Sequence, residues 1–69
     1  MIKFIGCNAF NIPKKYHAAI EEIQFEGRED GYWLYLNEGY KSENGYGCNT
    51  IHEYNRRDLM EQIRQITKV

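Results

Sequence analysis

The chain has 69 residues, of which 42% are hydrophobic and 28% are charged, a composition typical of a small globular domain rather than a disordered chain. A chain this short buries only about 60% of the surface that it exposes when unfolded, so its core must be small. Nine basic and ten acidic residues give a net charge of -1. This balance argues against direct binding to the nucleic-acid backbone, because proteins that do so carry a basic surplus.

Residues 1–6 lack the apolar run of a signal peptide, and the chain has no segment of about 20 apolar residues that could span a bilayer. We therefore expect a cytoplasmic protein without a membrane partner. In that compartment Cys7 and Cys48 are expected to be reduced thiols, although a disulfide between them is the alternative.

The first half of the chain predicts strands joined by polar turns. Residues 2–5 suit a first strand, and residues 20–26 alternate apolar and polar side chains as a half-buried strand does. Asp30-Gly31 predicts a hairpin turn into a return strand at residues 32–36. Residues 11–20 fit two interpretations: a helix capped by Asn11 with Pro13 in its first turn, or a loop that leads into a strand.

The second half predicts another hairpin and a helix. Asn44-Gly45 is a preferred pair for a tight hairpin turn, and the following strand is expected at residues 48–54. Asn55 is a suitable N-cap for a C-terminal amphipathic helix whose apolar stripe is Leu59, Met60, Ile63 and Ile66. We therefore predict a single α+β domain over residues 1–69, with an antiparallel sheet of three to four strands and the helix packed on one face.

Strand alternation predicts which side chains face the helix. The covered face is expected to consist of Ile23, Phe25, Leu34, Leu36 and Ile51. The opposite face then carries acids and aromatics together: Glu22, Gln24, Glu26, Trp33, Tyr35, Cys48, Thr50, His52 and Tyr54. Either the N-terminal eighteen residues cover this face, or it is exposed and open to a partner.

Groups that suggest catalysis or metal binding fail on geometry. Zinc-capable side chains occur at Cys7, His17, Cys48 and His52, but they lack the close pairs of a usual zinc site. His52 and Glu53 are neighbours on a strand and point to opposite faces, so they do not form a triad with Cys48. Gly45-Tyr46-Gly47 is turn chemistry, because it precedes a strand rather than the helix of a phosphate-binding loop. We predict neither an enzyme nor a bound cofactor or metal.

Two further side-chain pairs are candidates for ligand binding. Arg56 and Arg57, in the first turn of the helix, are either an anion site or a solvated surface. Trp33 and Tyr35 are of the type that stacks a nucleobase, although the carboxylates of Glu22 and Glu26 would repel a nucleic-acid backbone.

The predicted amphipathic helix follows two tyrosine-containing segments. These are residues 30–40, with the sequence DGYWLYLNEGY, and residues 49–54, with the sequence NTIHEY. This arrangement resembles small uncharacterised accessory proteins of bacteriophages and mobile elements, over residues 30–66. The resemblance implies a counter-defence role of the anti-CRISPR kind, in which a small protein occupies a surface of a larger host complex. For a phage-encoded protein, the location would be the cytoplasm of the bacterial host.

The leading functional hypothesis is a non-enzymatic protein of phage type that binds and modulates a host protein or ribonucleoprotein complex. Its binding residues are predicted to be Glu22, Glu26, Glu29, Asp30, Trp33, Tyr35, His52 and Tyr54, because carboxylates on a rigid scaffold can occupy a nucleic-acid groove of a host protein. The alternative is a protein that binds a nucleotide or another small ligand as a homo-oligomer, since the chain is too small to enclose a pocket alone.

Overall fold

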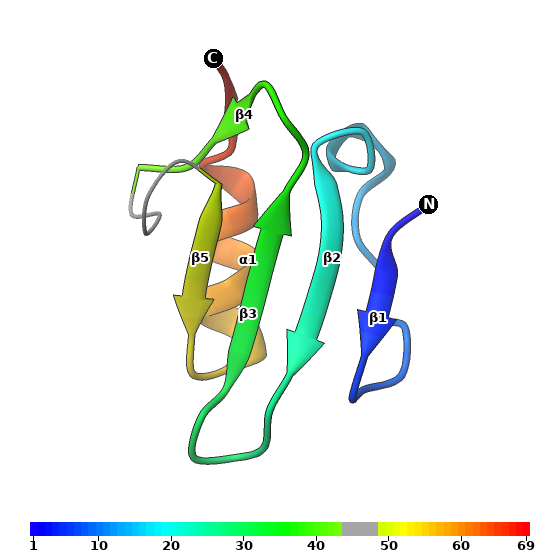
Figure 1. Ribbon diagram of the computed structural model, residues 1–69, viewed down its shortest axis with the longest axis vertical. Helices are drawn as coiled ribbons and strands as arrows, with labels where there is room; N and C mark the ends of the chain where they lie inside the picture. Colours follow the sequence, from blue (N-terminus) through cyan, green and yellow to red (C-terminus); the bar gives the residue numbers. More distant parts are fainter. Residues whose placement is uncertain (44–48) are drawn as a thin grey trace.

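The computed structural model describes residues 1–43 and 49–69. In chain order the elements are β1 (Lys3–Ile5), the 3-10 helix η1 (Lys14–Tyr16), β2 (Ile20–Phe25), β3 (Tyr32–Leu36), β4 (Tyr40–Lys41), β5 (Thr50–Glu53), α1 (Arg56–Arg64) and β6 (Thr67–Lys68). The main sheet has the order β1-β2-β3-β5, and β4 pairs with β6 in a separate ribbon. Figure 1 shows α1 behind β3 and β5, on one face of this sheet.

The predicted α+β class and the helix on one face are confirmed, but the sheet is mixed. β3 pairs antiparallel with β2 and β5, whereas β1 pairs parallel with β2. A parallel pair needs a crossover of about a dozen residues or more, and residues 6–19 supply it. The prediction of a purely antiparallel sheet was therefore wrong at β1.

The core lies between the sheet and α1, on the face that we call the inner face. The predicted inner residues are correct: Leu34, Ile23 and Ile51 are at most 1% exposed, and Phe25 packs on their cluster. Leu59 and Ile63 of α1 are fully buried against them. The full set of buried side chains in this cluster is Ile2, Ile12, Ile20, Ile23, Tyr32, Leu34, Leu36, Ile51, Leu59 and Ile63.

An irregularity in β2 adds one more aliphatic side chain to this core. Ile20 pairs with Leu36 while Glu22 pairs with Tyr35, so Glu21 is an extra residue on the β2 side. Such a bulge shifts the alternation by one position. Ile20 and Ile23 are therefore both buried although they are three residues apart.

The connection between β1 and β2 follows the loop interpretation of residues 11–20, with only the short turn η1 in place of a helix. Ile12 is buried in the core cluster, and the Phe10 ring contacts the rings of Phe4 and Tyr32. The connection therefore packs on the inner face beside α1. Neither of these elements covers the opposite face of the sheet, which we call the outer face.

Turns fix the ends of the central strands. The predicted hairpin between β2 and β3 is confirmed: the amide of Glu26 donates to the carbonyl of Gly31, and the amide of Gly31 donates to that of Gly27. Both glycines have positive φ angles, which L side chains rarely adopt. The predicted Asn44-Gly45 turn and Cys48 lie outside the described residues, and Tyr40 and Lys41 pair instead with β6.

The N-terminus of α1 is capped as predicted. Asn55 has extended backbone angles, and its side-chain oxygen accepts a hydrogen bond from the amide of Asp58 at 2.8 Å. Ser42 donates to the side chain of Gln62 at 3.1 Å, so the chain after β4 is tied to α1 by a buried polar pair. No helix in the described ranges combines the length and apolar character needed to cross a lipid bilayer.

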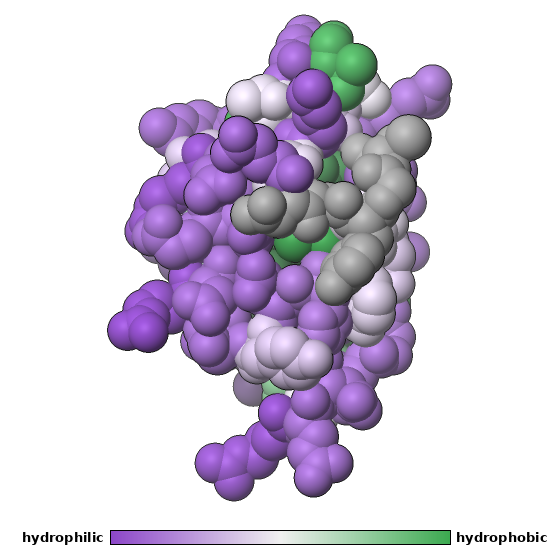
Figure 2. All heavy atoms as spheres, turned by 90° about the vertical axis from the view of Figure 1, so that its left-hand side faces the viewer, coloured by the Kyte–Doolittle hydropathy of each residue, from purple (hydrophilic) through white to green (hydrophobic). Residues whose placement is uncertain are grey.

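The side of the molecule that carries β5 is mainly hydrophilic, as Figure 2 shows, with hydrophobic surface at the end where the chain terminates. Val69 at this terminus is 81% exposed. Its amide donates to the carbonyl of Gly39, which holds the terminus beside the turn between β3 and β4.

The first prediction concerns the helix contact with the sheet. Ile63→Val removes one methylene group from a fully buried side chain, so we expect the free energy of unfolding to fall by about 1 kcal/mol. Urea denaturation followed by circular dichroism measures this change. Val69→Ala, at an exposed terminus, is the control and should change stability by less than about 0.5 kcal/mol. Equal effects of the two substitutions would contradict the described core.

The second prediction concerns the close approach of the β2–β3 hairpin to the end of β5. Gly31 has φ of 75°, and a Cβ atom there would lie 2.5 Å from the carbonyl oxygen of Glu53. Gly39 also has a positive φ, but its Cβ would meet nothing within 4 Å. We expect Gly39→Ala to cost about 1 kcal/mol for backbone strain alone. Gly31→Ala should cost clearly more in the same urea titration, and a smaller cost would refute the close packing.

Candidate protein-binding face

The outer face is built from alternate residues of four strands. β3 contributes Trp33 and Tyr35, each of which is half-buried. Two rows cross the sheet at these residues: Lys3, Glu22, Tyr35 and Thr50 form one, and Ile5, Gln24, Trp33 and His52 form the other. The register therefore places an aromatic column on β3 directly beside a polar and acidic column on β2.

Three rings form a continuous row at one end of this face. The ring centroids of Trp33 and His52 lie 4.7 Å apart, and those of His52 and Tyr54 are also 4.7 Å apart, with the two planes nearly perpendicular. Tyr54 lies just beyond β5 and is 66% exposed. Because edge-on and tilted ring pairs are favourable arrangements, the row presents a preordered aromatic surface.

His52 also anchors the hairpin tip to β5. Its Nε2 atom is hydrogen-bonded to the backbone carbonyl of Asp30. A carbonyl oxygen can only accept, so Nε2 carries a proton and donates this hydrogen bond. This bond crosses from β5 to the turn before β3, so it fixes the ring of His52 and the position of Asp30 together.

Carboxylates border the aromatic residues. Glu26 accepts a hydrogen bond from Nε2 of Gln24 at 3.2 Å, which orients its carboxylate beside the row of Trp33. Glu29 and Asp30 are exposed at the hairpin tip. Lys3 on β1 is the neighbour of Glu22 across the sheet, and no ion pair joins them among the residues that the structure places.

The structure brings most of the predicted binding residues onto one surface. Glu22, Trp33, Tyr35 and His52 share the outer face, whereas Glu29 lies in the turn at its end. Lys3 and Ile5 also belong to this face, and sequence reasoning missed them. A strand was expected at residues 2–5, but its parallel pairing with β2 was not, because the two strands are distant in sequence.

The residues considered for metal binding or catalysis are dispersed. Cys7 is a free, half-buried thiol, and His17 is hydrogen-bonded to the carbonyl of Ile12 at 2.8 Å. Glu53 pairs with Tyr32, one position away from His52 and on the other side of β5. Within residues 1–43 and 49–69, no cluster of three or more His, Cys, Asp or Glu side chains could hold a metal ion. Cys48 lies outside these ranges.

The two helix arginines lie in different surroundings. The guanidinium carbon of Arg56 lies 4.4 Å from the centroid of the Phe10 ring, so this side chain stacks on the β1–β2 connection. Arg57 is exposed. The first turn of α1 is already occupied by Asn55 and Asp58, which favours the interpretation of a solvated surface.

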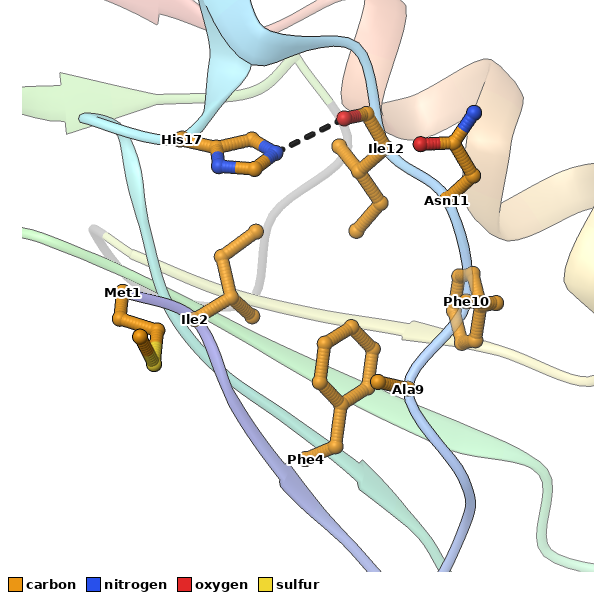
Figure 3. Close-up of a pocket in the computed structure, with 8 residues that line it drawn as sticks. All are labelled: Met1, Ile2, Phe4, Ala9, Phe10, Asn11, Ile12 and His17. Atoms are coloured by element: carbon orange, nitrogen blue, oxygen red, sulfur yellow. Dashed lines mark hydrogen bonds between the residues drawn. The ribbon is translucent and has the colours of Figure 1, made fainter.

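A small apolar hollow lies between β1 and the connection that follows it. Its volume is about 270 Å³, and Figure 3 shows the side chains that surround it. Its lining residues are Met1, Ile2, Phe4, Ala9, Phe10, Asn11, Ile12 and His17. The lining contains neither lysine nor arginine, the side chains that most often pair with the phosphates of a nucleotide.

Comparisons with protein-family models, with curated proteins and with solved structures found no match to this chain. The resemblance of residues 30–66 to phage proteins therefore stays a prediction.

A third prediction tests whether His52 orders this face. His52→Phe keeps a ring between Trp33 and Tyr54 but removes the donor to the Asp30 carbonyl, so stability should fall by about 0.5–1.5 kcal/mol. Thr50→Val, on the same strand and face, should change it by less than about 0.5 kcal/mol. Chemical denaturation of both variants measures the difference. A His52→Phe variant as stable as the wild type would show that the hydrogen bond does not hold the hairpin.

Proposed function

We propose that the protein is a non-enzymatic binding protein that docks its outer face on a basic surface of a larger protein or ribonucleoprotein complex. The observation that carries the proposal is the aromatic row of Trp33, His52 and Tyr54 beside carboxylates, on the face that neither α1 nor the β1–β2 connection covers. In the setting that the phage resemblance implies, the complex belongs to the bacterial host, and binding modulates it.

Aromatic side chains on an ordered sheet favour protein binding. Tyrosine and tryptophan are enriched in protein interfaces, and they lose little conformational entropy on binding. Here the rings are held by strand pairing and by ring contacts, so little further ordering is needed when a partner arrives. Preorganisation of this kind increases affinity without additional contacts.

The distribution of charge favours a basic partner. Glu22 and Glu26 lie on or beside the outer face, and Glu29 and Asp30 are exposed at its end. The exposed cations Lys14, Lys15, Arg56, Arg57 and Arg64 lie on the connection and on α1, whereas exposed Lys3 and Arg28 lie on the outer face and at the hairpin tip. The net charge is only -1, but carboxylates predominate on the outer face and cations on the side of α1 and the connection. The resulting electric field would orient the outer face toward a positive surface.

The same charges disfavour two other occupants. A nucleic-acid backbone would be repelled by the carboxylates that border Trp33 and Tyr35. A second copy of the chain, placed face to face, would bring like charges together. The small-ligand alternative predicts instead a shift in melting temperature on addition of nucleotides.

The fourth prediction tests the face directly. A tagged chain carrying Trp33→Ala and Glu26→Lys is compared with the wild type in affinity purification from the cells in which the protein occurs. We expect the double variant to stay folded and to lose the partner, because the change removes a central ring and reverses a charge. Circular dichroism confirms the fold of both chains, and size-exclusion chromatography reports any self-association.

Glu61→Lys is the control for the charge reversal. Glu61 is an exposed residue of α1 that pairs with Arg64, so the substitution makes the same charge change on the other side of the molecule. This variant should keep the partner. If the folded double variant retained every partner of the wild type, the outer face would not be the binding surface.

A further inference from the structure

The apolar hollow between β1 and the connection that follows it has no part in the proposed function. Its volume is about 270 Å³. Phe4, which lines it, is the neighbour of Ile23 across the sheet, and Ile23 is fully buried on the inner face. Because neighbours across a sheet lie on the same side, the hollow opens on the inner side of β1, opposite the outer face.

The hollow is held in shape by the core. Ile2 and Ile12 line it and are 8% and 4% exposed, as members of the core cluster. The rings of Phe4 and Phe10 meet edge-on with their centroids 5.1 Å apart, and Phe10 also contacts the buried ring of Tyr32. These side chains are already ordered, so a ligand would not have to order them on binding.

The lining favours a neutral ligand. The described residues that form it include no aspartate, glutamate, lysine or arginine. Nε2 of His17 is hydrogen-bonded to the carbonyl of Ile12 at 2.8 Å, and Figure 3 shows the amide group of Asn11 directed away from Ile2 and Phe4. A charged group inside the hollow would lose its hydration without gaining a partner of opposite charge, which is costly.

The volume sets the size of the ligand. An apolar cavity of about 150 Å³ lined by Leu, Ile and Phe side chains accepts benzene, whereas drug-sized ligands occupy pockets of about 300–1,000 Å³. A hollow of about 270 Å³ lies between these limits and suits two fused rings. The rings of Phe4, Phe10 and His17 border it (Figure 3), and ring-to-ring contacts favour an aromatic ligand over an aliphatic one.

We propose that this hollow is a binding site for a small neutral aromatic molecule of about two fused rings. The site is formed within one chain, so it needs no second copy. It lies on the other side of the sheet from the aromatic row of the outer face, and the inference does not depend on the proposed function.

The fifth prediction uses naphthalene as the probe. It is titrated into the full chain with ¹³C-labelled isoleucine methyl groups, which are followed by NMR. We expect the methyl signals of Ile2 and Ile12 to shift progressively, because an aromatic ring beside them changes the local magnetic field. Ile63, buried between α1 and the sheet, is the internal control and should not shift. The melting temperature should rise with naphthalene concentration.

A charged analogue and two variants sharpen the test. Naphthalene-2,6-dicarboxylate has a carboxylate at each end, so one must enter the hollow, and it should cause less than about a tenth of the shift. Ala9→Leu enlarges an exposed lining residue whose Cβ points toward Phe4 (Figure 3), and should weaken naphthalene binding at least about tenfold. Ala18→Leu makes the same change at an exposed residue outside the lining and should leave binding unchanged. Circular dichroism confirms that both variants fold.

Each contrary result would overturn the inference. Constant signals of Ile2 and Ile12 up to the solubility limit of naphthalene would show that the hollow does not bind it. An equal shift of Ile63 would indicate unspecific entry into the core. Equal binding of the dicarboxylate would exclude selection for a neutral ligand, and full binding by folded Ala9→Leu would place the ligand elsewhere.

Discussion

Burial of one face of β3 against α1 is the constraint on which the rest of the structure depends. β3 lies between β2 and β5, and it buries Leu34 and Leu36 almost completely. A fully buried aliphatic side chain contributes about 1.5–3 kcal/mol, a large share of the stability of so small a domain. A slip of one residue would exchange the two faces of the strand. The core therefore fixes the register, and the register sends Trp33 and Tyr35 to the outer face.

The core is one-sided because both covering elements pack on the same side. α1 contributes Leu59 and Ile63, and the β1–β2 connection contributes Ile12. A chain of 69 residues has few further segments with which to form a second layer. Trp33 and Tyr35 on the outer face are half-buried, and neither α1 nor the β1–β2 connection lies over them. This arrangement leaves an ordered surface of mixed aromatic and charged side chains on the outer face, which suits the proposed contact with a partner.

Local irregularities adjust the sheet to this single core. The bulge at Glu21 lets Ile20 and Ile23 point to the same side, and Gly31 allows the hairpin to approach the end of β5 more closely than a residue with a Cβ atom would. The hydrogen bond from His52 to Asp30 joins the same two segments. The close contact between the β2–β3 hairpin and the end of β5 therefore supports the core and also orders the proposed binding surface.

The sequence by itself determined the features that local periodicity encodes: the alternation of β2 and β3, the hairpin before Tyr32, the Asn55 cap and the apolar stripe of α1. These follow from side-chain direction and capping within a few residues. Only the tertiary structure decided that β1 pairs parallel with β2, that residues 6–19 cover the inner face, and that Lys3 and Ile5 join Trp33 on the outer one. Such pairings are set by the burial that the whole chain can achieve together, which no short segment specifies on its own.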